Sequence, residues 1–198
     1  MIMRLGILGG TFDPIHCGHI RMAEYCRDKL RLNKIYFIPA GNPPHKKPQI
    51  SYDLRVQMLH LALNGNLHFE IKELEKQEQA RNYTYTYYTL QKIRIEHPND
   101  ELYFLMGEDN VSEISTWFKY NEMLNLAQFI IINRPANPKN HSHDFSFSRE
   151  LTFLEMPKID ISSHCIRNMC SKGQSIKGLV PDKVEDFIEN NSLYIEVT

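Results

Sequence analysis

Several features are scarce in this 198-residue sequence, and each absence excludes a class of protein. No apolar run approaches the roughly 20 residues that a membrane-spanning helix needs; the best example is residues 129–132. The chain starts in glycine-rich sequence without the pattern of a signal peptide, so we expect a cytoplasmic protein. The net charge of −1 argues against a general binder of nucleic acid or membrane surfaces.

Cysteine is also scarce. Four cysteines in a chain of this length are expected to be free thiols and not a disulfide framework; they are Cys17, Cys26, Cys165 and Cys170. Their spacing to the histidines fits no tetrahedral zinc site well, so we predict no metal held by the protein's own side chains.

Short apolar runs alternate along the chain with amphipathic segments. The runs are typical of strands buried on both faces of a parallel sheet, and they cover residues 4–8, 35–38, 102–106 and 129–132. Helical spacing appears between them in two sets, Ile20, Ala23, Cys26 and Leu30, and Leu54, Met58, Leu61 and Ala62. Near the end Pro181 can open a helix that carries Val184, Phe187 and Ile188 on one face. The alternation predicts an α/β fold, a Rossmann-like doubly wound parallel sheet flanked by helices, as one domain over residues 1–198.

Three segments are ambiguous from sequence alone. Residues 40–51 and 134–149 are long polar loops after predicted strands, and such loops are either functional or plain surface connections. Residues 82–90 have the composition of a strand, but their position between two apolar runs suits a crossover helix.

The first predicted strand runs into residues 9–19, GGTFDPIHCGH, and then into an amphipathic segment. Glycines at such a turn let backbone N–H groups approach a phosphate, and a helix N-terminus favours anions. His16 and His19 are three residues apart, so both can face one ligand. The turn has neither the G-x-G-x-x-G nor the Walker spacing, which argues against a dinucleotide oxidoreductase and a P-loop enzyme.

A second polar motif lies about 150 residues later. Ser162 and Ser163 supply hydroxyl and N–H groups where a helix would begin, and Arg167 adds a fork for phosphate oxygens one turn on. Alone, this segment would be an ordinary capped helix.

Together the motifs resemble those of the nucleotidyltransferase superfamily. HCGH at 16–19 is similar to its H-x-G-H, and ISSHCIR at 161–167 to its I-S-S-T-x-I-R. Within the superfamily the sequence resembles the bacterial nicotinate-nucleotide adenylyltransferases from end to end. Further similar segments are GGTFDP at 9–14, PPHK at 43–46, NYTYT at 82–86, MGEDN at 106–110 followed by Trp117, NRP at 133–135 and GLVP at 178–181. His164 stands where the family usually has threonine, and Ala136 where it often has glycine.

The resemblance implies a reaction. The 5′-phosphate of nicotinate mononucleotide would attack the α-phosphate of ATP in line, giving deamido-NAD and pyrophosphate in NAD biosynthesis without a covalent enzyme intermediate. A histidine nucleophile ranks lower because the phosphate is itself nucleophilic. Mg²⁺ would be carried by the ATP phosphates. The implied partners are small molecules, with no nucleic acid and no membrane, and homo-oligomerisation stays open.

The resemblance also implies roles for individual residues. The catalytic set is His16, His19, Lys46 and Arg167. The ATP-binding set is Gly9, Gly10, Thr11, Phe12, His16, His19, Gly107, Asp109, Arg134, Ser162, Ser163 and Arg167. The set for the second substrate is His45, Lys46, Thr84, Tyr85, Thr86 and Trp117. From the residues alone, Trp117 could equally be a core side chain, Asp109 a helix cap, and Arg134 a solvated charge.

Other functions stay open at this stage. Pantetheine-phosphate adenylyltransferases and cytidylyltransferases share the superfamily core, but neither carries the PPHK loop with this tryptophan. A non-catalytic nucleotide-binding module could use the same fold. A small metal-binding protein could use His16, Cys17, His19 and residues 141–144, although four tetrahedral ligands are not evident.

The near-neutral net charge hides a regional difference. Residues 1–60 contain nine Lys and Arg against four Asp and Glu, whereas residues 61–198 contain 14 against 20. The positive region includes the glycine-rich turn, both motif histidines and the Lys46-Lys47 pair. This distribution favours a local site for small anions over a polyanion-binding surface.

Overall fold

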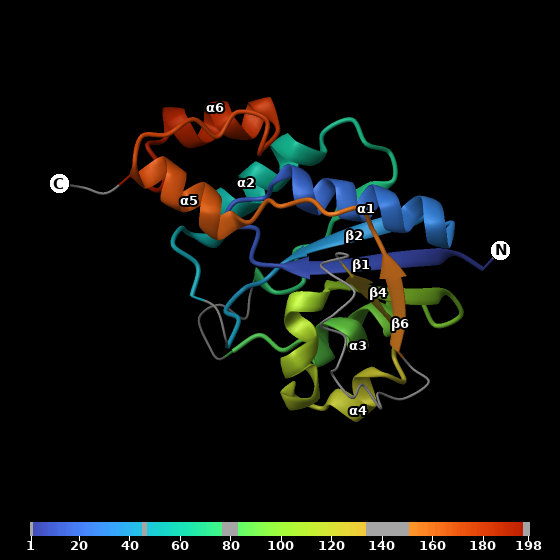
Figure 1. The fold of residues 1–198 in the computed structure, drawn as a ribbon. Helices are drawn as coiled ribbons and strands as arrows, with labels where there is room; N and C mark the ends of the chain where they lie inside the picture. Colours follow the sequence, from blue (N-terminus) through green and yellow to red (C-terminus); the bar gives the residue numbers. More distant parts are fainter. Residues whose placement is uncertain (1, 45–46, 77–82, 134–150, 196–198) are drawn as a thin grey trace, which may run out of the picture.

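Six parallel strands form a single sheet at the centre of the computed structural model, which describes residues 2–44, 47–76, 83–133 and 151–195 (Figure 1). The strands are β1 (Arg4–Gly10), β2 (Lys34–Pro39), β3 (Phe69–Ile71), β4 (Glu101–Gly107), β5 (Gln128–Asn133) and β6 (Leu151–Glu155). Their order is β3-β2-β1-β4-β5-β6, so the chain builds one half outward from β1 and then returns to build the other. This is the predicted Rossmann-like doubly wound sheet.

Helices cover both faces of the sheet because its inner strands, β2, β1, β4 and β5, are apolar on both sides. On one face lie α1 (Cys17–Leu30), α2 (Tyr52–Leu63), α5 (Ser163–Ser171) and α6 (Asp182–Asn190). On the other lie α3 (Thr86–Glu96), the 3₁₀ helix η2 (Glu108–Thr116) and α4 (Tyr120–Met123).

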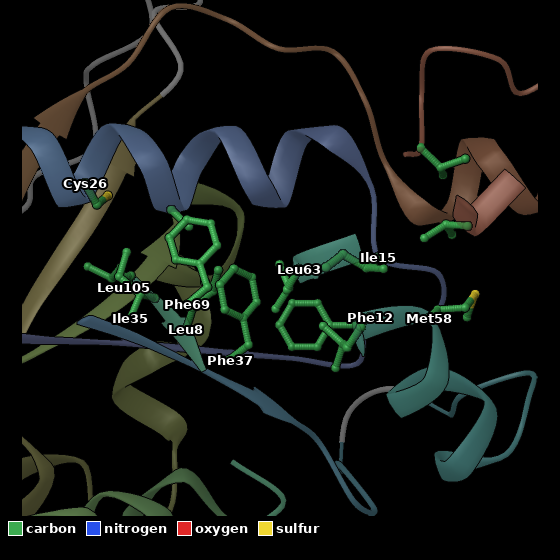
Figure 2. Close-up of a cluster of buried hydrophobic side chains, with 14 of the residues drawn as sticks. Leu8, Phe12, Ile15, Cys26, Ile35, Phe37, Met58, Leu63, Phe69 and Leu105 are labelled. Atoms are coloured by element: carbon green, nitrogen blue, oxygen red, sulfur yellow. The ribbon is translucent and has the colours of Figure 1, made fainter. Parts of the chain in front are cut away.

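The strand side chains alternate between two buried clusters, as a period of two requires. Along β2, Ile35 and Phe37 join the cluster beneath α1 and α2, whereas Tyr36 and Ile38 join the cluster on the α3 face. Figure 2 shows the first cluster, where the β2 side chains meet Cys26 of α1. Two filled faces hold the strand ends in fixed positions.

The four strands predicted from apolar runs are confirmed, but β3 and β6 carry weaker signals. β3 has three residues, and β6 is an edge strand whose central Thr152 and Phe153 are exposed. The ambiguous segment at 82–90 becomes helical from Thr86, and the last helix begins at Asp182 with Pro181 at its N-cap. No helix in the described part of the chain is long and apolar enough to cross a membrane.

β1 lies between β2 and β4, and here the direction of strand addition reverses. Loops after neighbouring strands on either side of such a point diverge and leave a crevice at the carboxyl ends. The glycine-rich turn follows β1 and the Gly107 turn follows β4, so both predicted ATP segments border this crevice.

Candidate active site

His16 and His19 stack against each other at the start of α1. Their ring centroids are 3.7 Å apart with an interplanar angle of 25°. His16 occupies the N-cap and is 4 % exposed, and its backbone N–H donates to Nδ1 of His19 over 3.3 Å. Phe12, buried and with a left-handed φ of 49°, meets the His19 ring edge-on at 5.1 Å. The two histidines therefore form one unit at the positive end of a helix.

The turn before His16 is tied to the start of α5. Ser163 donates from Oγ to the carbonyl of Pro14 over 2.9 Å, and Arg167 donates from Nη1 to the carbonyl of Asp13 over 2.6 Å. Ser162 is the N-cap of α5, and its Oγ accepts from the N–H of Cys165. The structure thus brings together the two motifs that the sequence separates by about 150 residues.

Arg167 also lines a hollow of about 400 Å³ beside α5, together with His164, Gln49 and Tyr194. Among the described residues, neither motif histidine lines this space. Arg167 therefore contacts the histidine-bearing turn through one nitrogen and borders an open, polar space wide enough for phosphate groups.

Two buried ionisable side chains, Asp13 and Arg55, support the turn that precedes His16. Neither of them was among the site residues predicted from the sequence. Asp13 is 3 % exposed; its Oδ2 accepts from the N–H of Gln49 over 2.6 Å and its Oδ1 from the hydroxyl of Tyr194 over 2.7 Å. Arg55 is 1 % exposed and donates to the carbonyls of Thr11 and Ala40, over 2.6 and 2.8 Å.

Desolvation lowers the pKa of Arg55, while the nearby Asp13 carboxylate opposes that shift. A guanidinium keeps its charge through such a shift because its ordinary pKa lies so high. The burial of Arg55 could have been predicted from its spacing. It precedes the buried Met58 and Leu59 by three and four residues, so it lies on the same face of α2.

Glycines at the ends of β1 and β4 border the crevice. Gly9 and Gly10 end β1, and the carbonyl of Gly10 accepts from the N–H of Ala40 over 2.8 Å. A β-carbon on Gly107 would lie 2.4 Å from Oδ1 of Asp109, so any larger residue there would require the Asp109 side chain to move. Asp109 is exposed in the first turn of η2.

Trp117 follows η2 and is partly buried, with its ring edge-on to Phe104 at 6.2 Å. The side chain thus packs against the core while keeping part of its surface exposed. Both the core role and the binding role considered from sequence are compatible with this position.

Residues 84–86 lie at the start of α3. Thr84 is 5 % exposed and pairs with Asn42, donating its N–H to the Asn42 carbonyl over 2.9 Å and accepting the Asn42 N–H at Oγ1 over 3.2 Å. Tyr85 is the N-cap of α3, and Thr86 is its first residue. The two hydrogen bonds between Thr84 and Asn42 join the loop after β2 to the N-terminus of α3. The first N–H groups of a helix have no partner within the helix and can bind a ligand.

Three predicted site residues, His45, Lys46 and Arg134, lie outside the described residues. Within the described ranges, no group of three or more His, Cys, Asp or Glu side chains is arranged to hold a metal ion. The other predicted residues lie around the carboxyl ends of β1, β2 and β4 and the N-terminus of α5.

Comparison with known proteins shows the family to which the chain is similar. The cytidylyltransferase-like family model matches residues 7–169. A probable nicotinate-nucleotide adenylyltransferase of Geobacter sp. (strain M21) is 36 % identical, covering 98 % of this chain and 99 % of the relative. Another, from Clostridium tetani (strain Massachusetts / E88), is 36 % identical with coverage of 95 % and 97 %.

Solved structures share the fold. The nicotinic acid mononucleotide adenylyltransferase of Plasmodium falciparum complexed with NaAD has a TM-score of 0.78 at 23 % identity, covering 97 % of each chain. The same enzyme complexed with APC has a TM-score of 0.76 at 22 % identity, again covering 97 % of each chain.

Proposed function

The chain belongs to the cytidylyltransferase-like family and, within it, to the nicotinate-nucleotide adenylyltransferases, and we propose that it transfers the adenylyl group of ATP to nicotinate mononucleotide. The products are deamido-NAD and pyrophosphate, and the reaction is a step of NAD biosynthesis. One observation carries the proposal: Ser163 and Arg167 hydrogen-bond to the turn that presents the stacked histidines. That arrangement gathers anion-binding groups from both ends of the chain at one helix N-terminus.

The reaction needs positioning more than covalent chemistry. An oxygen of the acceptor's 5′-phosphate forms a bond to the α-phosphorus of ATP while the bond from that phosphorus to the bridging oxygen of pyrophosphate breaks. Because the acceptor is already an anionic nucleophile, no covalent enzyme intermediate is required. The protein has to hold two anions in line and neutralise the charge that develops between them.

We assign the neutralisation of that charge to His16 and the groups around it. The two imidazoles at the N-terminus of α1 stabilise the α-phosphate, where the helix dipole adds to their effect. Ser162, Ser163 and Arg167 at the start of α5 bind the β- and γ-phosphates. Lys46 stays a predicted catalytic residue, and His45 and Arg134 stay predicted contacts. The ATP site also includes the turn after β1, with Gly9, Gly10, Thr11 and Phe12, and the turn after β4, with Gly107 and Asp109.

The pyridine end of the acceptor is assigned to the start of α3 and to Trp117. Since the N–H of Thr84 already pairs with Asn42, the donors for the ring carboxylate are the first N–H groups of α3 and the hydroxyls of Thr84 and Thr86. Tyr85 holds the cap position between them. The exposed part of the Trp117 ring offers a flat face for the pyridine.

Magnesium enters this scheme as part of the substrate. Mg²⁺ usually keeps several water ligands and is coordinated by substrate phosphate oxygens, so we infer that it arrives bound to ATP. A cytoplasmic location stays a prediction from the sequence.

A transfer assay tests the function. Pyrophosphate release from ATP is measured with a panel of phosphorylated acceptors, including nicotinate mononucleotide, nicotinamide mononucleotide and 4′-phosphopantetheine. We expect rapid release with nicotinate mononucleotide and none with phosphopantetheine. No pyrophosphate release with any acceptor would favour a non-catalytic nucleotide-binding module. Release with phosphopantetheine alone would favour a pantetheine-phosphate adenylyltransferase.

Variants of the two histidines test the site. His16→Ala and His19→Ala should each lower kcat by about 100-fold or more, as loss of a group that stabilises transition-state charge does, while both variants stay folded. His60→Ala, an exposed histidine on α2, is the matched control and should keep wild-type turnover. Near-normal turnover in either motif variant would contradict the assigned role.

A further inference from the structure

The turn that carries His16 is held by hydrogen-bond donors from four separate parts of the chain, of which three contribute side chains and one a backbone N–H. Its carbonyls at residues 11, 13 and 14 accept from Arg55 of α2 and from Arg167 and Ser163 of α5. The Asp13 carboxylate accepts from the backbone of Gln49 and from Tyr194. The first three of these donors fix backbone, whereas the last two fix one buried side chain.

Tyr194 reaches this turn from the segment that follows α6. It lies 181 residues from Asp13 and adopts a left-handed backbone conformation with a φ of 63°, as does Ser192 with a φ of 48°. Two residues in that region within three positions bend the chain back from the end of α6. The bend delivers the hydroxyl to Oδ1 of Asp13 at 2.7 Å.

The hydroxyl is a dependable donor at this position. Desolvation raises the pKa of Tyr194, and the adjacent Asp13 carboxylate raises it further, so the phenol keeps its proton near neutral pH. With Gln49 on Oδ2 and Tyr194 on Oδ1, both oxygens of a carboxylate that is 3 % exposed are occupied. A buried carboxylate that loses one of two donors is strongly driven to move toward another partner.

We infer that Tyr194 is a positioning residue for adenylyl transfer: its hydroxyl fixes Asp13, and Asp13 in turn fixes the approach of His16 and Arg167 to the phosphates. The inference rests on the proposed function. Asp13 links three segments, because its carboxylate holds the loop containing Gln49 and its carbonyl holds Arg167. His16 follows only three residues later, so rotation of Asp13 displaces the histidine pair as well as Arg167.

Removal of one oxygen atom tests this role. Tyr194→Phe should lower kcat about tenfold while the KM for nicotinate mononucleotide changes less than twofold, because the pyridine end binds at α3 and not at this turn. The matched control is Tyr103→Phe. Tyr103 is 6 % exposed and donates to Oε2 of Glu101 over 2.6 Å, a similar tyrosine–carboxylate bond, but at the amino end of β4. An equal loss of kcat in the control, or wild-type kcat in Tyr194→Phe, overturns the inference.

A double-mutant cycle tests the route through Asp13. If Tyr194 acts through that carboxylate, adding Tyr194→Phe to Asp13→Ala, which removes both acceptor oxygens, should cost little beyond Asp13→Ala alone. Losses that simply multiply would mean that Tyr194 acts by another path, which overturns the proposed mechanism.

A measurement without substrate separates this inference from the proposed function. Backbone amide hydrogen exchange of a peptide covering residues 11–20 should be faster in Tyr194→Phe than in the wild type, and unchanged in Tyr103→Phe. A wild-type protein silent in the transfer assay, yet showing this local change, would refute the adenylyl transfer while leaving Tyr194 as the residue that orders the turn. Unchanged exchange in Tyr194→Phe overturns the positioning role whatever the wild-type activity.

Discussion

A β-carbon placed on Gly18 would lie 2.9 Å from Nδ1 of His16 and 3.0 Å from its Cε1. Gly18 is the second residue of α1, and its φ lies outside the left-handed region. The glycine between the two histidines therefore makes room for an imidazole and is not needed for an unusual backbone. The His16 ring can stack on His19 because the chain has no side chain at this position.

Gly18→Ala should separate activity from stability. Alanine is favoured over glycine inside a helix by about 1 kcal/mol, so the thermal midpoint should stay constant or rise. The added methyl group should push the His16 ring aside and lower kcat roughly 10- to 100-fold. Steady-state kinetics and a thermal melt on the same sample check both parts. Cys17→Ala, one residue earlier, is the control and should keep most of its activity; wild-type kcat in Gly18→Ala would contradict the crowding argument.

The success of the strand prediction depended on burial. Strands β1, β2, β4 and β5 are near-continuous apolar runs because helices cover both of their faces. β6 lies at the edge of the sheet, where Thr152 and Phe153 face solvent, so no apolar run marks it. β3 is only three residues long. Edge strands owe their conformation to a neighbour, and the sequence of the strand itself carries little trace of that pairing.

The residues of the candidate site likewise fall into two groups, those that a local sequence motif predicts and those that only the fold reveals. His16, His19, Ser162, Ser163 and Arg167 stand in local motifs, and resemblance was enough to select them. The support for those residues is long-range: Arg55 to Thr11, and Tyr194 to Asp13. A hydrogen bond between residues 181 positions apart has no local pattern, and residues 192–195 show nothing that distinguishes them from an ordinary exposed tail until the fold is known.

Arg55→Met should destabilise the protein by about 2–4 kcal/mol, because it leaves the carbonyls of Thr11 and Ala40 without this donor and removes one of the positive charges near the Asp13 carboxylate. Methionine fills a similar volume, so packing changes contribute little. Urea unfolding with a constant m-value measures the effect. The control is Arg21→Met at an exposed position on α1, expected within about 0.5 kcal/mol of wild type. Equal stabilities of the two variants would contradict the structural role of Arg55.

Nicotinate mononucleotide should be preferred over the corresponding amide by about 100-fold in kcat/KM. The N-terminus of α3 supplies N–H donors and the positive end of a helix dipole, both of which favour a carboxylate. An amide offers one acceptor oxygen and would direct N–H groups toward those donors. Competition kinetics with both substrates gives the ratio directly. A ratio near one would refute the assignment of the ring carboxylate to this helix.

Thiol labelling should follow burial, with Cys165 modified first and Cys26 last. Cys165 is exposed on α5, whereas Cys26 lies buried on the core side of α1, where desolvation raises its pKa to about 12. The thiolate is the form that reacts with iodoacetamide, and a raised pKa lowers its fraction at any given pH. At pH 8 a group with a pKa near 12 is ionised only about once in ten thousand molecules, so Cys26 should react only through local opening of the fold.

Burial also raises the pKa of Cys17, whose side chain is partly exposed, so its labelling rate should fall between the other two. Peptide mass mapping after timed labelling at pH 8 gives the order, and the same experiment in urea, where all four thiols are exposed, should abolish it. Labelling of Cys26 as fast as Cys165 in the folded protein would contradict the packing of α1 against the sheet. That packing fixes the position of α1 and, with it, of His16 and His19 at its N-terminus.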